Sequence, residues 1–276
     1  MGFSINTNVG ALNAYNALAK INAQTEKAQL RLATMKKINS VADDTSGYNV
    51  GKQLEAQTLT QKAQLNNIAS AKNYLATAES ALQQIADKLN QIKAKQTDAD
   101  DPLKDSAAIA NDIRTLAKEI DSILKNTNIN GTQLLASTDG STALSDATFD
   151  VGGSSFSVDF ASDTYLKVGD LATAIGTSNL QSTTDSTVLD YNTTTVADNV
   201  RNALLRLGNL SQTLDSREEY LTAAIANNTA TISNIFDADV AMEQLNATKG
   251  QIGAQVATAM VAQMNTAPQQ ILSLFR

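Results

Sequence analysis

Two groups of carboxylates are the side chains of this sequence whose spacing could do chemistry. Asp43 and Asp44 are adjacent, and Asp237 and Asp239 lie two residues apart near the other end of the chain. Such carboxylates could bind a divalent cation or act as a general acid and base. The chain contains no histidine and no cysteine, which removes the commonest partners of carboxylates in zinc sites and acid–base catalysis. We therefore predict no catalytic residue, no metal site and no cofactor.

Helix capping is the simpler role for these carboxylates, because Asp accepts hydrogen bonds from the free N–H groups at the start of a helix. Ion pairs are the other structural role, and the nearby cations are Arg31, Lys36 and Lys37. An enzyme would also need a zinc motif or a nucleophile with its base in the middle of the chain, and the sequence 136–195 contains neither. The sequence thus indicates a protein that is not an enzyme.

The composition favours packed helices over a thick globular core. Hydrophobic residues make up 42% of the 276 residues, but aromatic residues only 4%, and tryptophan is absent. Much of the apolar content is alanine, which lets helices approach closely but fills little volume. No stretch approaches the ~20 apolar residues that span a bilayer, and the sequence does not open with the basic and apolar regions of a cleaved secretory signal.

Charge is unevenly distributed along the chain. The net charge of −7 comes from +5 in residues 1–95, −11 in residues 96–200 and −1 in residues 201–276. Weakly charged ends suit packing inside an assembly, whereas an acidic middle suits a face that stays in water. No basic stripe accompanies stacking aromatic residues, so the pattern argues against a nucleic acid as partner.

Apolar residues recur every three or four positions in long stretches near both ends, which predicts helices with one narrow seam for a partner. The sequence favours helices over about 11–35, 50–95 and 238–266, and a further helix that ends near Asn126. The expected seams comprise Leu18, Ile21, Thr25, Ala28, Leu32 and Met35 in the first helix, Leu65, Ile68, Lys72, Leu75, Glu79, Leu82, Ile85, Leu89 and Ile92 in the second, and Val196, Val200, Ala203, Leu207, Leu210, Leu214, Leu221, Ile225 and Ile232 after residue 195.

The middle of the chain changes its hydrophobic period from helical to alternating. Phe149, Val151, Phe156, Val158 and Phe160 alternate with polar residues, and the Gly-Gly-Ser-Ser of residues 152–155 separates two such runs. This pattern predicts a β-hairpin with one apolar face. Residues 171–175 are expected to form a short helix over it. The insert is too small for a robust core of its own, so we expect it to pack on the helices.

The last helix carries its large apolar residues on one stripe and its alanines elsewhere. The stripe consists of Leu245, Ile252, Val256, Met260 and Met264. After Pro268 the apolar residues 271–275 form an unusually hydrophobic tail. Because such a tail is unfavourable in water, we expect other subunits to bury it.

Four motifs in order along the chain resemble those of bacterial flagellin. Residues 8–13, 30–32 and 38–47 are similar to the N-terminal signature of that family, the last as Ile-Asn-Ser-Val-Ala-Asp-Asp-Thr-Ser-Gly. Residues 130–135 resemble its Asn-Gly-x-x-Leu-Leu, and residues 237–243 its Asp-Ala-Asp-x-Ala-x-Glu. Residues 268–274 match the family's C-terminal ending. Any one motif alone would be weak, but together they cover both ends of the chain.

The resemblance implies a structural subunit that self-assembles into the helical filament of the bacterial flagellum. The expected fold is mainly α, with long antiparallel coiled-coil-like helices from both termini and a small β-hairpin insert. Residues 1–45 and 237–276 would form the inner core, residues 46–135 and 196–236 the helical wall, and residues 136–195 a small outward-facing insert. The chain resembles a short flagellin without large outer domains.

The resemblance and the seams together predict which residues form the subunit interface. Apolar seam residues supply most of the set, and the motif residues Arg31, Asp43, Asp44, Asp237 and Asp239 supply the rest. The apolar members are Leu12, Leu18, Ile21, Leu32, Leu245, Ile252, Val256, Met260, Met264, Ile271, Leu272 and Leu274.

The partners implied by the resemblance are further copies of the chain, an export chaperone that binds the C-terminal segment, the filament cap, the hook–filament junction proteins and possible other flagellins. No nucleic acid and no membrane insertion are expected. The location would be outside the cell, in the flagellum, after export of the unfolded chain through the flagellar type III apparatus without a cleaved signal. Terminal segments without partners are expected to be largely disordered in the monomer.

Two other functions remain open at the level of sequence. A hook–filament junction protein has similar terminal helices, and a signalling coiled-coil rod has similar Ala- and Gln-rich heptads. One departure from the flagellin pattern also stands out, because residues 33–37 (Ala-Thr-Met-Lys-Lys) lack the glycine that the family often has before Ile-Asn-Ser. This loss predicts a straighter or shifted hinge.

Overall fold

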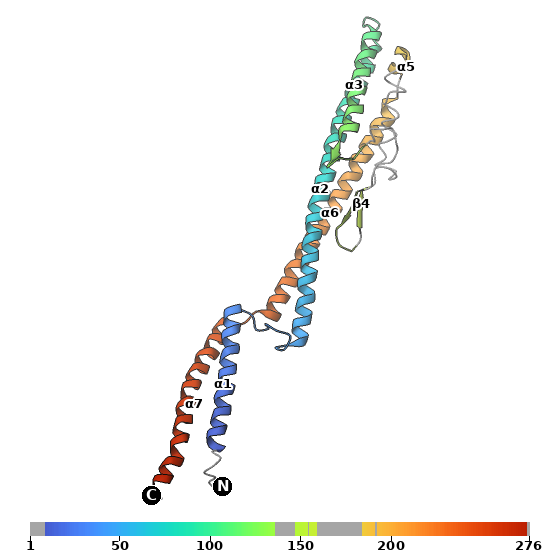
Figure 1. Cartoon of the computed structure of the whole chain (residues 1–276). Helices are drawn as coiled ribbons and strands as arrows, with labels where there is room; N and C mark the ends of the chain where they lie inside the picture. The colour runs from blue at the N-terminus through green and yellow to red at the C-terminus, as the bar shows by residue number, and fades with distance from the viewer. Residues whose placement is uncertain (1–8, 136–146, 154, 159–183, 191, 275–276) are drawn as a thin grey trace. The chain divides into compact units, whose positions relative to one another are not determined.

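The computed structural model describes residues 9–135, 147–153, 155–158, 184–190 and 192–274 (Figure 1). The chain divides into two compact units, which we call the terminal unit (residues 1–58 and 226–276) and the central unit (residues 59–225). Helices α2 (Thr45–Ala99) and α6 (Thr193–Phe236) each contribute residues to both units. The described residues are mainly helical, as predicted. None of their helices is long and apolar enough to cross a membrane.

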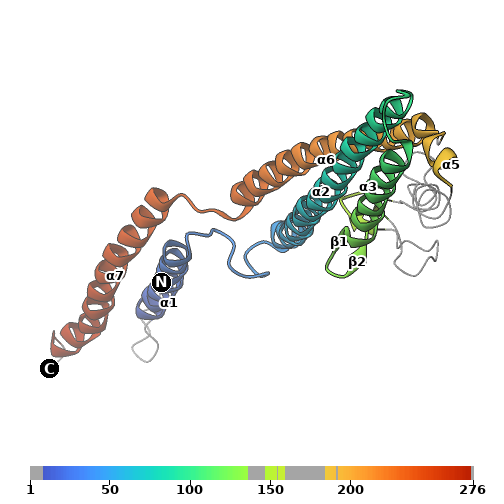
Figure 2. The same ribbon diagram turned by 90° about the horizontal axis from the view of Figure 1, so that it is seen from above.

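The terminal unit is built on two antiparallel helices, α1 (Val9–Thr34) and α7 (Val240–Leu274), which lie side by side (Figures 1 and 2). Where they meet the connecting segments, Lys36 and Asp237 form an antiparallel β-bridge. The Lys37 N–H donates to the Phe236 carbonyl over 2.7 Å, and the Ala238 N–H donates to the Met35 carbonyl over 2.9 Å. The backbone itself therefore fastens the two ends of the chain together.

Helix α7 is longer than the sequence pattern indicated. The predicted helix ended near residue 266, but α7 continues through Pro268 to Leu274. A proline within a helix removes one N–H donor and crowds the preceding turn. Here it stands within the last two turns of the helix, where little helix remains beyond it to be disrupted.

The central unit packs α3 (Ser106–Asn126) and the central-unit parts of α2 and α6 against one another. Lys95 of α2 pairs with Asp112 of α3 at 2.7 Å, and Lys88 pairs with Glu119. Because the numbers rise on one helix as they fall on the other, α2 and α3 are antiparallel. The Thr193 hydroxyl at the start of α6 donates to Gln96 over 3.2 Å. Lys72 pairs with Glu218 further along, so α2 and α6 are also antiparallel.

Helix α3 begins after a capping aspartate and ends before a tight β-turn. The Asp105 carboxylate accepts hydrogen bonds from the N–H groups of Ala107 and Ala108, at 3.0 and 3.3 Å. After Asn126 the chain forms a tight ladder of β1 (Asn128–Ile129) and β2 (Thr132–Gln133). Its turn places Asn130 at φ 50° and Gly131 at φ 80°, a left-handed backbone that asparagine and glycine tolerate best. The ladder itself was not predicted, because two-residue strands leave no alternating pattern.

The predicted β-hairpin is present as β3 (Ala147–Asp150) and β4 (Ser155–Val158), paired antiparallel with Phe149 opposite Phe156. Its apolar face packs on α2, where Phe149 and Tyr74 meet edge to face with ring centroids 5.8 Å apart. Gly152 and Gly153 turn the chain at φ 87° and 79°. The Asn67 amide fixes the end of β3 by donating to the Asp150 carbonyl over 2.9 Å. The hairpin therefore packs on the helices, as expected.

A short helix, α5 (Asp185–Leu189), also covers this unit and was not predicted. Its Val188 is fully buried, and Asp185 pairs with Arg114 of α3 at 2.6 Å. The predicted helix over 171–175 and the predicted strand residue Phe160 lie outside the described residues.

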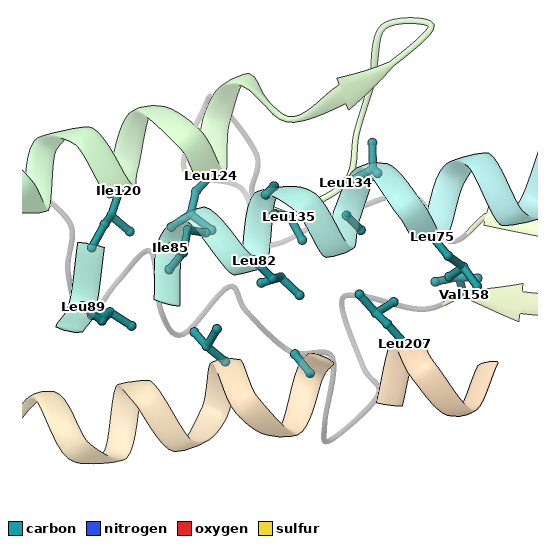
Figure 3. Close-up of a cluster of buried hydrophobic side chains, with 14 of the residues drawn as sticks. Leu75, Leu82, Ile85, Leu89, Ile120, Leu124, Leu134, Leu135, Val158 and Leu207 are labelled. Atoms are coloured by element: carbon teal, nitrogen blue, oxygen red, sulfur yellow. The ribbon is translucent and has the colours of Figure 1, made fainter. Parts of the chain in front are cut away.

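The core of the central unit is a heptad seam of large aliphatic side chains (Figure 3). On α2 the seam follows spacings of three and four, with alanines only in its first half: Ile68, Ala71, Leu75, Ala78, Leu82, Ile85, Leu89 and Ile92. The prediction that Lys72 and Glu79 belong to this seam was wrong, because Ala71 and Ala78 are the buried residues at those turns of the helix. Charged side chains lie beside the seam instead, where Lys72 reaches Asp215 and Glu218 of α6. The predicted α6 seam is confirmed from Val196 to Leu221.

We expect Leu82→Ala to destabilise the central unit by about 2–5 kcal/mol, because Leu82 is completely buried and its loss leaves a cavity. The matched control is Leu103→Ala, since Leu103 is 93% exposed in the loop before α3 and its truncation leaves no cavity. Urea unfolding of the full chain, followed by far-UV circular dichroism, measures both. Equal midpoints for the two variants would contradict this account of the core.

Candidate functional site

Helix α7 has two faces of opposite character. One face, which we call the small-residue seam, turns toward the chain's own interior and consists of Glu243, Ala247, Gly250, Ala254, Ala257 and Val261. The other face, which we call the outward stripe, carries large apolar side chains that are about half exposed or more: Leu245 at 62%, Ile252 at 58%, Val256 at 55% and Met260 at 49%. The larger side chains are therefore the ones that the monomer leaves in water.

The geometry of a helix explains why α7 cannot bury both faces on one partner. Leu245, Ile252 and Val256 each follow a seam residue by two positions, which is about 200° around the helix axis. These three residues thus lie on nearly the opposite side of α7 from the seam, and Met260 lies at the edge of the stripe, about 100° around the axis from Val261. A single neighbouring helix covers one side only.

Helix α1 meets the seam with its own predicted heptad residues. Ile21 packs where Gly253 leaves room, with its Cγ2 atom 3.5 Å from the position that a Cβ on Gly253 would take. Thr25 and Ala28 are buried, and Leu18 and Leu32 are half-buried. Met35, the last predicted seam residue, is exposed because α1 ends at Thr34.

One ion pair lies within this close helix contact. Arg31 of α1 and Glu243 of α7 approach to 3.3 Å, with 32% and 11% of their side chains exposed. Glu243 stands in the first turn of α7, where the helix dipole favours a negative charge. The pair therefore ties the C-terminal end of α1 to the N-terminal end of α7.

The carboxylates singled out from the sequence have structural roles. Asp44 accepts a hydrogen bond from the Gly47 N–H at 2.9 Å in the first turn of α2. Asp239 caps α7, because its carboxylate accepts from the Ala241 and Met242 N–H groups at 3.0 and 3.1 Å. Asp237 accepts a hydrogen bond from the Ser233 hydroxyl. No group of three or more metal-binding side chains is assembled among the described residues.

Asp43 is the most constrained of these carboxylates. It pairs with Lys27 at 3.1 Å and also accepts hydrogen bonds from the Asn39 and Ser40 N–H groups, at 3.2 and 3.1 Å. The Lys27 ammonium, followed by those two N–H groups, lowers the pKa of Asp43 to about 2. The predicted cation partners were Arg31, Lys36 and Lys37, but Lys27 is the one that pairs with Asp43, since it projects from α1 toward the connecting segment.

The connecting segments are held by a small aromatic cluster around Phe236. Tyr48 meets Phe236 edge to face at 6.2 Å, and the Lys36 ammonium lies 5.5 Å from the centre of the same ring. A Cβ atom on Gly51 would overlap the ring, so only glycine fits there. Met35 turns the chain with a left-handed φ of 56°, so the bend after α1 persists without the glycine that flagellins often have.

The remaining predicted interface residues lie at three places. Leu12 is exposed on α1, beside the exposed Val9 and Tyr15. Met264 is half-buried near the end of the seam. Ile271, Leu272 and Leu274 belong to the last turns of α7, and their side chains lie outside the described ones.

Sequence reasoning found the α1 side of this helix contact but missed the α7 residues that face it. The seam from Glu243 to Val261 keeps spacings of four and three, so its signal was present, but small residues carry little hydrophobic weight and the larger outward stripe masked it. The Arg31–Glu243 and Lys27–Asp43 pairs join residues 212 and 16 positions apart in the chain. No local pattern indicates such pairings.

The arrangement offers surfaces for association rather than a centre for catalysis. The carboxylates described above cap helices, accept hydrogen bonds or form ion pairs, and large exposed apolar residues line up on α7. Chemically, this geometry can bury apolar area against another helix and fix the position of that helix.

Two family models match most of the chain. The model described as the bacterial flagellin N-terminal helical region matches residues 5–139, and the model described as the bacterial flagellin C-terminal helical region matches residues 189–275. The first match includes α1, α2 and α3, and the second includes α6 and α7.

Individual flagellar proteins are similar over almost their full length. The chain is 29% identical to flagellin FlaB1 of Treponema pallidum (strain Nichols) and 27% identical to the flagellin of Bacillus subtilis (strain 168). It is also 27% identical to the flagellar filament 33 kDa core protein of Treponema phagedenis. In each case 99% of this chain and 99% of the relative are covered.

The Asp43 network predicts a loss of order in the connecting segment at low pH. The folded-state pKa of about 2 lies below the ordinary value of 3.8, so the network's stabilisation is complete above about pH 4 and is lost as the pH falls through about 2. Carboxyl ¹³C NMR should therefore give a titration midpoint near 2 for Asp43, and Lys27→Ala should raise it. The control Lys20→Ala changes an exposed α1 cation and should leave the midpoint unchanged. A midpoint near 3.8 in the unaltered chain would contradict the network.

Proposed function

The chain belongs to the bacterial flagellin family, and we propose that its α1–α7 pair is the surface through which copies of the chain join into a filament. The protein is a structural subunit of the bacterial flagellar filament, located outside the cell in the flagellum. The alternatives of a hook–filament junction protein and a signalling rod are not favoured, because the relatives that match the whole chain are flagellins and a filament core protein. The family is a structural one, and we infer that the chain has no catalytic role.

The single observation that supports this surface is the outward stripe of α7. Leu245, Ile252, Val256 and Met260 are half exposed or more, although smaller residues on the opposite side of the same helix are packed inside the chain. Large apolar side chains lined up in water are unfavourable and are typical of association surfaces. A second copy of the chain supplies the cover that α1 does not.

A surface of this kind suits an open polymer. We propose that the outward stripe of one copy packs on a different surface of the next copy, the exposed side of α1 around Leu12, and such a contact is not self-complementary. When the rotation between neighbours does not close a ring, such contacts repeat without limit and produce a helical filament. Many modest contacts then add to a stiff assembly.

We propose that the predicted interface residues divide into two groups by their role. Leu12 on α1 and the outward stripe on α7 contact neighbouring copies directly. Leu18, Ile21, Leu32 and Arg31 act indirectly, because they hold α1 against α7 and so present the stripe. Asp43, Asp44, Asp237 and Asp239 act through the connecting segments, and Met264, Ile271, Leu272 and Leu274 extend the apolar surface toward the C-terminus.

The layering of the filament is a further part of the proposal. Residues 1–45 and 237–276 form the inner core, residues 46–135 and 196–236 the wall, and residues 136–195 an outward-facing insert. Charge supports this order, because residues 96–200 carry a net charge of −11 whereas the ends are weakly charged. Like charges on an outer surface repel less when water and ions surround them.

The same exposed stripe suggests what happens before assembly. A chain that carries apolar residues in water until it finds a neighbour benefits from a carrier, so we propose that an export chaperone covers the C-terminal segment. We further propose export of the unfolded chain through the flagellar type III apparatus without a cleaved signal, and contacts with the filament cap, the hook–filament junction proteins and other flagellins. The absence of cysteine is compatible with passage as an unfolded chain.

Removal of residues 237–276 should abolish filament formation, because the truncated chain lacks α7 and with it the outward stripe. Negative-stain electron microscopy after seeding with short filaments compares the full chain with the truncated one. The urea transition of the central unit serves as a folding control and should persist, since its core contains no residue beyond Leu221. Long filaments from the truncated chain would disprove the proposed surface.

A single charge on the outward stripe should weaken assembly strongly. Val256→Asp places a carboxylate where a neighbour is expected to bury an isopropyl group, and should raise the critical concentration by about tenfold or more, since burying a valine contributes ~1.5–3 kcal/mol. Gln255→Asp is the matched control, because it adds the same charge at the adjacent exposed position. Sedimentation of assembled protein against monomer measures both. Equal critical concentrations for the two variants would exclude the stripe as an interface.

A further inference from the structure

The small-residue seam of α7 leaves the register of the α1–α7 pair poorly determined by apolar packing. A slide of α7 by seven residues, about 10 Å along its axis, brings Ala254 to the place of Ala247 and Ala257 to the place of Gly250. The first exchange leaves the residue type unchanged, and the second adds one methyl group. Heptad seams of similar small residues therefore need another interaction to select one register.

Two features of the structure select the register. The first is electrostatic, because Arg31 meets Glu243 at 3.3 Å and Glu243 is almost fully buried. In a register shifted by one heptad, Arg31 would face Gly250 and the Glu243 carboxylate would lose this partner. A buried carboxylate without its cation is costly, whereas the paired groups add little net stability, so such a pair discriminates between arrangements more than it stabilises one.

The second feature is steric. Gly250 faces Thr25, and a Cβ atom at residue 250 would overlap the Thr25 hydroxyl. That hydroxyl is held in place, since it donates to the Ile21 carbonyl over 2.8 Å. A shift of seven residues in either direction would put Ala257 or Glu243 opposite Thr25. Glycine at residue 250 is therefore the one seam residue that fits Thr25 closely.

We propose that the Arg31–Glu243 pair and the Thr25–Gly250 contact specify the register of α1 on α7. Through the register they decide which apolar side chains the pair presents together on its outer surface. Arg31, Thr25, Glu243 and Gly250 are thus positioning residues, which act by placing Leu12 and the outward stripe. The assignment concerns contacts within one chain and holds whether or not that chain polymerises.

The absence of native cysteine allows the register to be read by disulfide formation in the full chain. Ile21→Cys with Gly253→Cys reports the native register, because the two side chains are neighbours there. Ile21→Cys with Met260→Cys reports the register shifted by one heptad. The ratio of the two cross-link yields, measured at equilibrium in a thiol–disulfide buffer before and after assembly, measures the register preference.

In the unaltered background the native cross-link should exceed the shifted one by at least about tenfold. Glu243→Gln should reduce this ratio by about tenfold, because a neutral amide loses no ion pair in the shifted register. The Arg31 side chain is 32% exposed, so water solvates its charge in either register. The control Glu26→Gln removes an exposed carboxylate from α1 and should leave the ratio unchanged. Gly250→Ala should also reduce the ratio, because an alanine would then meet the Thr25 hydroxyl in the native register as Ala257 does in the shifted one. Thr25→Ala alone should reduce it too, because without the hydroxyl Ala257 no longer overlaps residue 25 in the shifted register.

The Met260 cross-link distinguishes a register effect from simple unfolding. A poorly folded Gly250→Ala chain would lose both cross-links, whereas a shifted one gains the Met260 cross-link. An unchanged ratio in Glu243→Gln and Gly250→Ala would overturn the inference, and so would a chain in which neither cross-link forms in any state. Filament formation is scored separately, so a chain that keeps its register but does not polymerise would contradict the proposed function alone.

Discussion

The packing of α7 through its small side chains is the constraint on which the terminal unit depends. Because Ala247, Gly250 and Ala254 face α1, the two helices can approach closely, but the area that they bury is small. The larger apolar residues lie about 200° away around the helix and stay exposed in the single chain. A helix pair built in this way has its strongest hydrophobic contribution still available for a neighbour.

The central unit follows the opposite rule. Its seam on α2 places leucine and isoleucine side chains at zero or nearly zero exposure. The hairpin adds Phe156 and Val158 to the same core, and Figure 3 shows Val158 there. Charged residues such as Lys72 and Lys88 lie at the edges of the helix contacts, where they pair across to α6 and α3. This unit buries its large residues inside the chain. The difference between the units is one of side-chain volume at the seam, since both use the same heptad spacing.

The chemistry of the carboxylates is that of capping and pairing. Asp239 starts α7, Asp44 starts α2, and Asp43 gathers a lysine and two backbone N–H groups around the segment between α1 and α2. Together with the Phe236 cluster they fix the connecting segments that join α1 and α7 to the long helices. Family motifs around these residues therefore have a local physical explanation. Each one ends or begins a helix at a defined residue.

The sequence by itself determined the class of fold, the position of most helices, the β-hairpin and the family, because heptad spacing, strand alternation and turn glycines are local properties of the chain. It did not determine which residues of α7 face α1, since the seam uses Ala247 and Gly250, whose small side chains carry little hydrophobic weight. It also placed Lys72 and Glu79 in a seam that Ala71 and Ala78 occupy. Only the tertiary structure paired Lys27 with Asp43 and Arg31 with Glu243. Such pairings depend on how segments far apart in sequence pack against each other. A local sequence pattern does not indicate which distant residues come into contact.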